Sequence, residues 1–439
     1  MSTLPFSSIL IFLIIIIISS SIAEAIVPPT KTFKIINRGD FEDRYDTEYA
    51  DTFRYLHITS FPFSLCFHNA TPDAFLLAIQ MGSPNNESFL RWVWDANRNR
   101  PVRENAALTF GSNGNLVLTD YDGTIAWQTE TANKGVVGIG LFNNGNLVLY
   151  NAKGQFVWQS FDYPTDSLLI GQSLRPTGPN KLIARRSNLD PSEGPYSMVL
   201  QGEKLAFYLQ SKNSKYPLKY YSNEELSNSP LSRVFLNCTP QTKKQFAYEV
   251  RFELFVNTSF THSYVLAKLN YNSSFSILRL ESDGNLKVYT FYDKVDSMSW
   301  DVPYSLFGGR FSLCNLPSKC GSLGLCDEEQ CVACPTQEGL LGWSSDCKPP
   351  DLPPCDVNGS NIDYYKVEDV ENFSSFLAYG EGNATIGDCE AMCSKDCGCL
   401  GFFFWEDLQR CFLAPELMTL NKAYNAAHVG YIKKAKSTS

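Results

Sequence analysis

Short apolar stretches separated by turn residues dominate the chain from about residue 45 to residue 305. Gly, Asn, Asp and Pro stand between these stretches, and helical periodicity is almost absent. Such a pattern is typical of short β-strands joined by tight turns. It therefore predicts a mainly β fold over this part of the chain.

The sequence NGNLVL occurs twice, 31 residues apart, and each copy predicts a turn followed by a strand. Asn-Gly dipeptides favour the positive φ that tight hairpin turns require. Side chains alternate along a strand, so Leu147 and Leu149 of the second copy are expected in a core. The opposite face consists of Asn144, Asn146, Val148 and Tyr150. It can offer amide groups and a ring to a ligand, but the turn geometry alone already explains why the sequence is repeated.

Tryptophans repeat with a similar period. Trp94, Trp127 and Trp158 are separated by 33 and 31 residues. Repeat units that cannot bury themselves alone are expected to close around a common axis, with the tryptophans filling it. A weaker copy of the repeat, ESDGNLKVY at 281–289, indicates a second, degraded domain of the same kind.

The length and the amino terminus predict the organisation and the compartment. A chain of 439 residues is too long for one core, so several domains are expected. Residues 1–25 contain an apolar run, Ile9 to Ile18, followed by small residues, which is typical of a secretory signal peptide. No later apolar stretch is long enough for a transmembrane helix, and the Lys-rich end excludes a GPI tail. The sequence therefore predicts a secreted, extracellular protein without a membrane anchor.

Charge and motif content exclude several functional classes. A net charge of −9 without a long basic run argues against nucleic-acid binding. The four histidines lie in no HExxH motif and beside no nucleophile elbow. Cys331 and Cys334 form a CxxC motif, but secretion and neighbouring cysteines favour disulfides over zinc or redox chemistry. We therefore expect no enzyme, no metal site and no cofactor.

The carboxyl-terminal third is rich in cysteine. Of 14 cysteines, six lie between Cys314 and Cys347 and six between Cys355 and Cys411, and prolines at 349–354 predict a stiff linker between the two groups. In GDCEAMCSKDCGC, Asp388 is expected to cap a helix. N-glycosylation is expected at six N-x-[ST] sequons, at Asn86, Asn257, Asn272, Asn358, Asn372 and Asn383.

Several motifs together resemble a plant protein family. WVWDANRNRPV at 92–102, the paired NGNLVL units and WQSFDYPTDSLLIGQ at 158–172 resemble a bulb-type mannose-binding lectin. SNLDPSEGPYS at 187–197 is similar to the start of an S-locus-type region. As a whole, the chain resembles the plant secreted glycoproteins described as epidermis-specific, which are relatives of the S-locus glycoproteins and of lectin receptor kinases.

This resemblance implies a mainly β fold of tandem β-prism domains followed by small disulfide-rich EGF-like and α+β PAN/apple modules. The expected bounds are 1–25 for the signal peptide, 45–175 for the bulb-type lectin-like domain, 176–305 for its degenerate copy, 310–350 for the EGF-like module and 355–435 for the PAN domain. The implied cystines are Cys389–Cys411, Cys393–Cys399, Cys355–Cys397, Cys314–Cys326, Cys320–Cys331 and Cys334–Cys347. Cys66 and Cys238 remain, and arithmetic alone pairs them.

The family's mannose site is a strand with the pattern Gln-x-Asp-x-Asn-x-Val-x-Tyr. At 142–150, Phe142 and Asn144 replace Gln and Asp, while Asn146, Val148 and Tyr150 match. At 281–289, Asp283, Asn285 and Tyr289 match, but Lys287 stands where Val should pack; the 111–119 strand fits less well. The mannose site is therefore degenerate. Each lost hydrogen bond to a sugar hydroxyl costs about 1 kcal/mol, so two losses are expected to abolish useful mannose binding at a given strand. The 142–150 strand is the best candidate, because Phe142 can stack on a sugar face.

The resemblance implies a secreted, non-catalytic glycoprotein of the apoplast or cell wall. Its expected partners are glycans or glycoproteins of the cell wall. In the alternative hypothesis, sugar binding is lost and the protein is an extracellular scaffold that binds a protein partner through its PAN and lectin-like domains.

Overall fold

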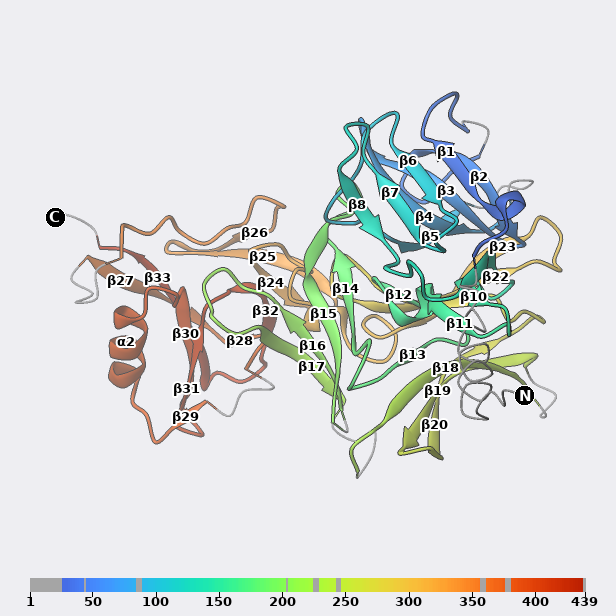
Figure 1. The fold of residues 1–439 in the computed structure, drawn as a ribbon. Helices are drawn as coiled ribbons and strands as arrows, with labels where there is room; N and C mark the ends of the chain where they lie inside the picture. The colour runs from blue at the N-terminus through green and yellow to red at the C-terminus, as the bar shows by residue number, and fades with distance from the viewer. Residues whose placement is uncertain are drawn as a thin grey trace, which may run out of the picture.

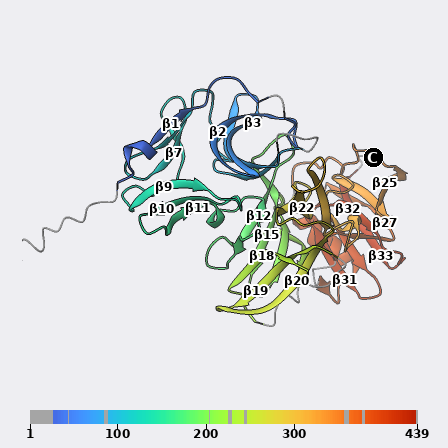
Figure 2. The same cartoon turned by 90° about the vertical axis from the view of Figure 1, so that its right-hand side faces the viewer.

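The computed structural model describes residues 26–42, 45–83, 89–202, 204–223, 229–241, 246–355, 361–375 and 380–436. The described residues form two β-prisms and a carboxyl-terminal part with one described α-helix (Figure 1). Both views place the second prism between the first prism and the carboxyl-terminal part (Figure 2). The predicted mainly β class with tandem prisms is confirmed. Residues 1–25 and the sequons at Asn86 and Asn358 lie outside the described residues.

The first prism consists of three antiparallel sheets. Leucines of the NGNLVL strands, including Leu116 and Leu147, are buried in its core. Gly114 (φ 79°) and Gly145 (φ 85°) have the positive φ that their turns require. The sheets are β2 (Thr52–Ser60), β3 (Phe63–Thr71), β4 (Ala74–Met81) and β5 (Arg91–Asp95); β1 (Phe33–Ile36), β6 (Ala107–Phe110), β7 (Leu116–Thr119) and β8 (Ile125–Gln128); and β9 (Val136–Leu141), β10 (Leu147–Asn151) and β11 (Phe156–Gln159).

The second prism repeats this plan with three four-stranded antiparallel sheets. They are β12 (Ser167–Leu169), β21 (Ser276–Leu280), β22 (Leu286–Tyr292) and β23 (Ser299–Ser305); β13 (Ser173–Leu174), β18 (Arg233–Pro240), β19 (Tyr248–Val256) and β20 (Ser259–Leu269); and β14 (Lys181–Arg185), β15 (Glu193–Gln201), β16 (Lys204–Leu209) and β17 (Leu218–Asn223). Both prisms begin earlier in the chain than expected. Strand β1 of the first prism precedes residue 45, and strands β12 and β13 of the second prism precede residue 176.

The two cysteine-rich regions, named the EGF-like and PAN regions after the modules they are expected to form, share a sheet. Strand β24 (Leu323–Asp327) pairs with β25 (Gln330–Thr336) and, in parallel, with β32 (Met418–Lys422). Strands β26 (Gly339–Gly342) and β28 (Val370–Asn372) complete this sheet. The second sheet of this part has the order β27 (Ile362–Glu368), β33 (His428–Ala435), β30 (Gly401–Trp405), β31 (Arg410–Ala414) and β29 (Glu381–Gly382). The prolines at 349–354 therefore connect two regions that are also joined by strand pairing.

Helix α2 (Ile386–Lys395) lies where the cysteine-rich motif predicts a helix. Its N-cap is Thr385, and Asp388 completes a capping box at the third helical position. Cys389 and Cys393 are buried and bond to Cys411 and Cys399. The helix is thus fixed to β31 and to the loop before β30. Single turns of 3-10 helix occur at Pro29–Lys31, Ser160–Asp162 and Leu313–Asn315.

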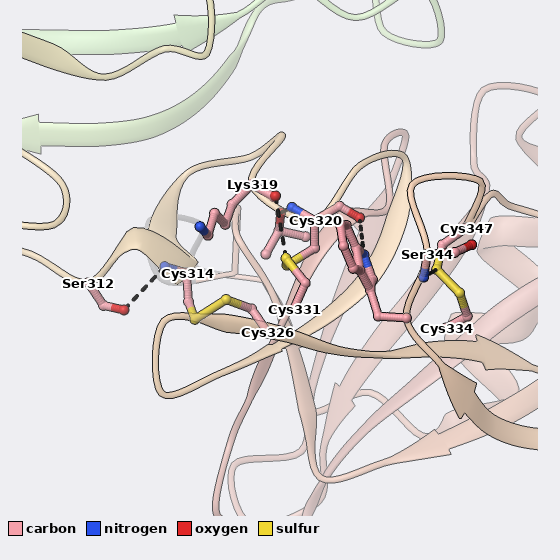
Figure 3. Close-up of a disulfide and its surroundings, with 11 residues drawn as sticks. Ser312, Cys314, Lys319, Cys320, Cys326, Cys331, Cys334, Ser344 and Cys347 are labelled. Atoms are coloured by element: carbon pink, nitrogen blue, oxygen red, sulfur yellow. Dashed lines mark hydrogen bonds between the residues drawn. A yellow bond between two sulfur atoms is a disulfide. The ribbon is translucent and has the colours of Figure 1, made fainter.

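The described residues contain all six cystines that the resemblance implies. Figure 3 shows the three of the EGF-like region, and the PAN region contains the other three. The seventh pairing is wrong, because Cys66 and Cys238 are free. Cys66 lies on β3 beside Phe53 and Trp92, whereas Cys238 lies on β18 against the core of the second prism. Burial raises the pKa of both thiols, that of Cys238 to about 12.

The remaining sequons differ in accessibility. Asn257, Asn272 and Asn383 are exposed. Asn372 is only 1% exposed, and its side-chain amide donates to the carbonyl oxygens of Glu416 (3.1 Å) and Leu417 (2.9 Å). A glycan on that nitrogen would disrupt both hydrogen bonds, so the structure contradicts the expectation that Asn372 is glycosylated.

Candidate carbohydrate-binding site

Strand β10 follows the second NGNLVL turn, and Leu147 and Leu149 pack in the core as the alternation predicts. The other face was expected to be open, but Val148 is fully buried and Asn146 is only 3% exposed. The hairpin tip packs against the start of the second prism, where a Cβ on Gly145 would lie 2.8 Å from Leu169 Cδ1. The prediction of an open ligand-facing surface is therefore wrong at these two positions.

Asn146 uses its side-chain amide within the fold. Its Nδ2 donates to Gln159 Oε1 (2.8 Å), and its Oδ1 accepts from the Ser160 hydroxyl and the Phe161 backbone N–H, both at 3.3 Å. These bonds tie the turn before β10 to the end of β11. Because the amide is buried and satisfied, it has little capacity left for a sugar hydroxyl.

The corresponding asparagines of the other repeats do the same. Asn115 donates to Gln128 Oε1 (2.9 Å) and accepts from the Thr131 backbone N–H (3.0 Å). Asn285 donates to the Phe307 carbonyl (2.9 Å) and accepts from the Phe307 N–H (3.0 Å). This role was missed from the sequence, although the Trp-Gln pairs at 127–128 and 158–159 repeat with the asparagines and supply two of the partners.

Three residues of the 142–150 site keep some access to solvent. Phe142 is 40% exposed and packs edge-on against Phe156, with 5.4 Å between ring centroids. Asn144 is half-buried and accepts from the Asn146 backbone N–H (3.1 Å). Tyr150 is half-buried, and Lys31 Nζ lies 5.9 Å from its ring centroid. The main open feature of this strand region is thus aromatic.

The 281–289 site is closed at Asn285 and Tyr289, which are buried, whereas Asp283 is exposed. Asp283 accepts from the Asn285 backbone N–H (2.8 Å). Tyr289 is buried and donates its hydroxyl to Glu281 Oε1 (2.7 Å), while Arg91 of the first prism lies over its ring. Burial and the Glu281 carboxylate raise the pKa of Tyr289. This tyrosine therefore joins the two prisms.

The repeated tryptophans converge as the period predicts. The ring centroids of Trp94, Trp127 and Trp158 lie 5.6 to 6.2 Å apart in edge-to-face contacts. They do more than fill a core, because all three line a pocket of about 600 Å³ at the end of the first prism. The sequence could not indicate this pocket, since its other wall comes from β14 and β15 of the second prism.

Comparison with known proteins gives two family matches. Residues 91–184 match the D-mannose binding lectin domain, and residues 227–342 match the S-locus glycoprotein domain. With the two prisms, these matches define a bulb-type lectin-like glycoprotein of plants.

Relatives identify the family. EP1-like glycoprotein 2 of Arabidopsis thaliana is 44% identical, over 97% of this chain and 99% of that protein. Epidermis-specific secreted glycoprotein EP1 of Daucus carota is 46% identical, over 76% of this chain and 90% of that protein. The chain belongs to the family of EP1-like glycoproteins, which confirms the resemblance. A solved structure, the fetuin-binding two-domain lectin of Scilla campanulata, covers 59% of this chain and 96% of its own at 16% identity, but its TM-score of 0.20 supports no conclusion.

Proposed function

We propose that the protein is a secreted, non-catalytic glycoprotein that recognises glycans of the cell wall or of other glycoproteins. The observation that carries this proposal is the match of residues 91–184 to a D-mannose binding lectin domain within a two-prism fold. The name of the carrot relative, an epidermis-specific secreted glycoprotein, supports export to the apoplast or cell wall. Within the described residues, the structure contains no helix long and apolar enough to cross a bilayer.

A role as a protein-binding scaffold is the second candidate. It is favoured by the burial of two predicted sugar-binding residues, because the side-chain amides of Asn146 and Asn285 form hydrogen bonds within the fold. In this case the PAN region, whose α2 is fixed by two cystines, supplies a rigid surface for a protein partner.

A glycan array separates the two candidates. The protein is secreted from a plant host and screened against cell-wall oligosaccharides and N-glycans, with Phe142→Ala beside it because this exposed ring is the main open part of the strand site. Binding to at least one glycan is expected. Silence from folded protein contradicts glycan recognition and favours the scaffold. Turnover of a bound glycan, abolished by one carboxylate substitution, contradicts the non-catalytic assignment.

A further inference from the structure

The pocket at the junction of the two prisms contains none of the residues of the predicted mannose-binding strands. Its first wall is the tryptophan cluster with the loops at 95–100 and 163–165, and its second wall includes Lys181, Ile183 and Glu193 of the second prism. We infer that this pocket binds a short neutral saccharide, an inference that rests on the proposed glycan-recognition function. It lies apart from the β10 strand face.

The aromatic surface of the pocket suits a pyranose ring. Trp127 is half-exposed, and Tyr163 is 57% exposed and stacks on Trp158 with 5.6 Å between centroids and 17° between planes. Apolar C–H faces of sugars pack against such flat rings while the hydroxyls remain free for hydrogen bonds. The volume of about 600 Å³ lies inside the range of roughly 300–1,000 Å³ typical of small-molecule sites.

The pocket lining also carries hydrogen-bonding groups. The Trp94 indole donates to the Tyr163 carbonyl (2.8 Å), and Trp127 and Trp158 bring two further indole N–H donors to the lining. The hydroxyl of Thr165, another lining residue, is buried without a partner among the described groups. Polar groups enclosed in a protein are usually paired, so the Thr165 hydroxyl is expected to meet a ligand hydroxyl or water.

The balance of charge favours a neutral ligand. Arg98 does not offer a free cation, because it bonds to Asp95 (2.6 Å) and Asp166 (2.9 Å). An acidic oligosaccharide would need an excess of basic groups. The charged lining residues are three acids and three bases: Asp95, Glu130, Glu193, Arg98, Arg100 and Lys181.

The two walls are held in a fixed relation. Besides its acidic partners, Arg98 of the first prism donates to the carbonyl oxygen of Ile183 on β14 (3.1 Å). Asn99 accepts through its side chain from the Glu193 backbone N–H (3.1 Å). A pocket whose walls are bonded together loses little conformational entropy when a ligand enters.

The test follows the NMR signals of the tryptophan indoles during titration and compares binding by wild type and by Tyr163→Ala. The glycosylated full chain, carrying ¹⁵N-labelled tryptophan, is titrated with mannotetraose, cellotetraose, xylotetraose and, as an acidic comparison, tetragalacturonate. At least one neutral tetrasaccharide is expected to shift the Trp127 and Trp158 indole signals, with no shift at Trp405 of the PAN region and none with the acid. Tyr163→Ala should weaken that binding at least about tenfold. Tyr121→Ala, an equally exposed tyrosine (57%) outside the pocket, should not.

The outcomes distinguish this inference from the proposed function. Glycan-array binding that is unchanged in Tyr163→Ala, with no shift of either indole, overturns the pocket and leaves glycan recognition standing. Loss of binding in Phe142→Ala alone also overturns the pocket and assigns the site to the strand region. Folded protein that binds neither array glycans nor tetrasaccharides overturns both.

Discussion

One asparagine recurs at the same point of three hairpins and joins the turn to the chain that follows the next strand. Asn115, Asn146 and Asn285 each donate through Nδ2 and accept through Oδ1. A sugar site and a structural cross-link require the same side chain, since both use one amide donor and one acceptor. The partners that Asn146 meets in the fold, Gln159 to Phe161, decide between the two roles.

Replacing Asn146 should reduce stability. Asn146→Ala leaves the buried Phe161 N–H and the Oε1 atom of Gln159 without their Asn146 partners, so it is expected to lower the free energy of unfolding by about 1–3 kcal/mol. Urea unfolding followed by tryptophan fluorescence measures this change. Asn143→Ala is the matched control, because Asn143 is the exposed neighbour in the same turn and should change stability by less than about 0.5 kcal/mol. Equal midpoints for the two variants would refute the cross-link.

At the scale of elements, the parallel pairing of β24 with β32 joins the two cysteine-rich modules of the carboxyl-terminal part. The cysteine spacing and the prolines indicate two small modules on a linker, and the cystines do stay within each group. Yet Leu323 and Leu325 of β24 share a core with Leu420 of β32, and the Cys320 N–H donates to the Thr419 hydroxyl (3.0 Å). The two modules are therefore one packed body.

Cutting the linker should not separate the modules. A protease site inserted before Asp351, cleaved in the folded protein, leaves two fragments with no cystine between them, because the pairs lie within 314–347 and within 355–411. The fragments are expected to co-elute on size exclusion in native buffer and to separate in concentrated urea. Separation in native buffer would show that the shared sheet does not hold them together.

At the scale of the whole molecule, buried ion pairs join the two prisms. Arg279 of β21 is 2% exposed and donates to Glu48 (2.7 Å) and to the Trp92 carbonyl of the first prism. Asp166, just before β12, accepts from Arg98. Burial alone would raise the pKa of Asp166, but Arg98, Arg279 and Arg185 outweigh burial and lower it to about 2.

This junction should weaken at low pH. Because the pKa of Asp166 is lower in the folded chain than its usual 3.8, its contribution is complete above about pH 4 and is lost as the pH falls through 2. The shift corresponds to about 2 kcal/mol. Denaturant unfolding of wild type and Asp166→Asn at pH values between about 5 and 2 measures it.

The variant should be destabilised by about 2 kcal/mol near neutral pH, since Arg98 keeps Asp95 but loses the charge of Asp166, and the gap should narrow towards pH 2. Asp346→Asn, at an exposed aspartate, is the control and should follow the wild type throughout. A difference in unfolding free energy between wild type and Asp166→Asn that does not depend on pH would contradict a stabilising role for the Asp166 carboxylate at the junction.

The sequence by itself determined the local features: the Asn-Gly turns, the strands after them, the tryptophan period, the capped helix α2 and the two cysteine groups. These follow from preferences over a few residues and from a repeat that cannot bury itself alone. With the family resemblance, they were sufficient for the tandem prisms and six cystines.

Only the tertiary structure decided which faces stay open. Whether a strand face is buried depends on what packs against it. Val148 and Asn146 are buried because the hairpin packs against residues such as Leu169. In the same way, Cys66 and Cys238 stayed unpaired because they belong to different prisms, and the pocket beside Trp127 arose where β14 and β15 of one prism meet the end of the other.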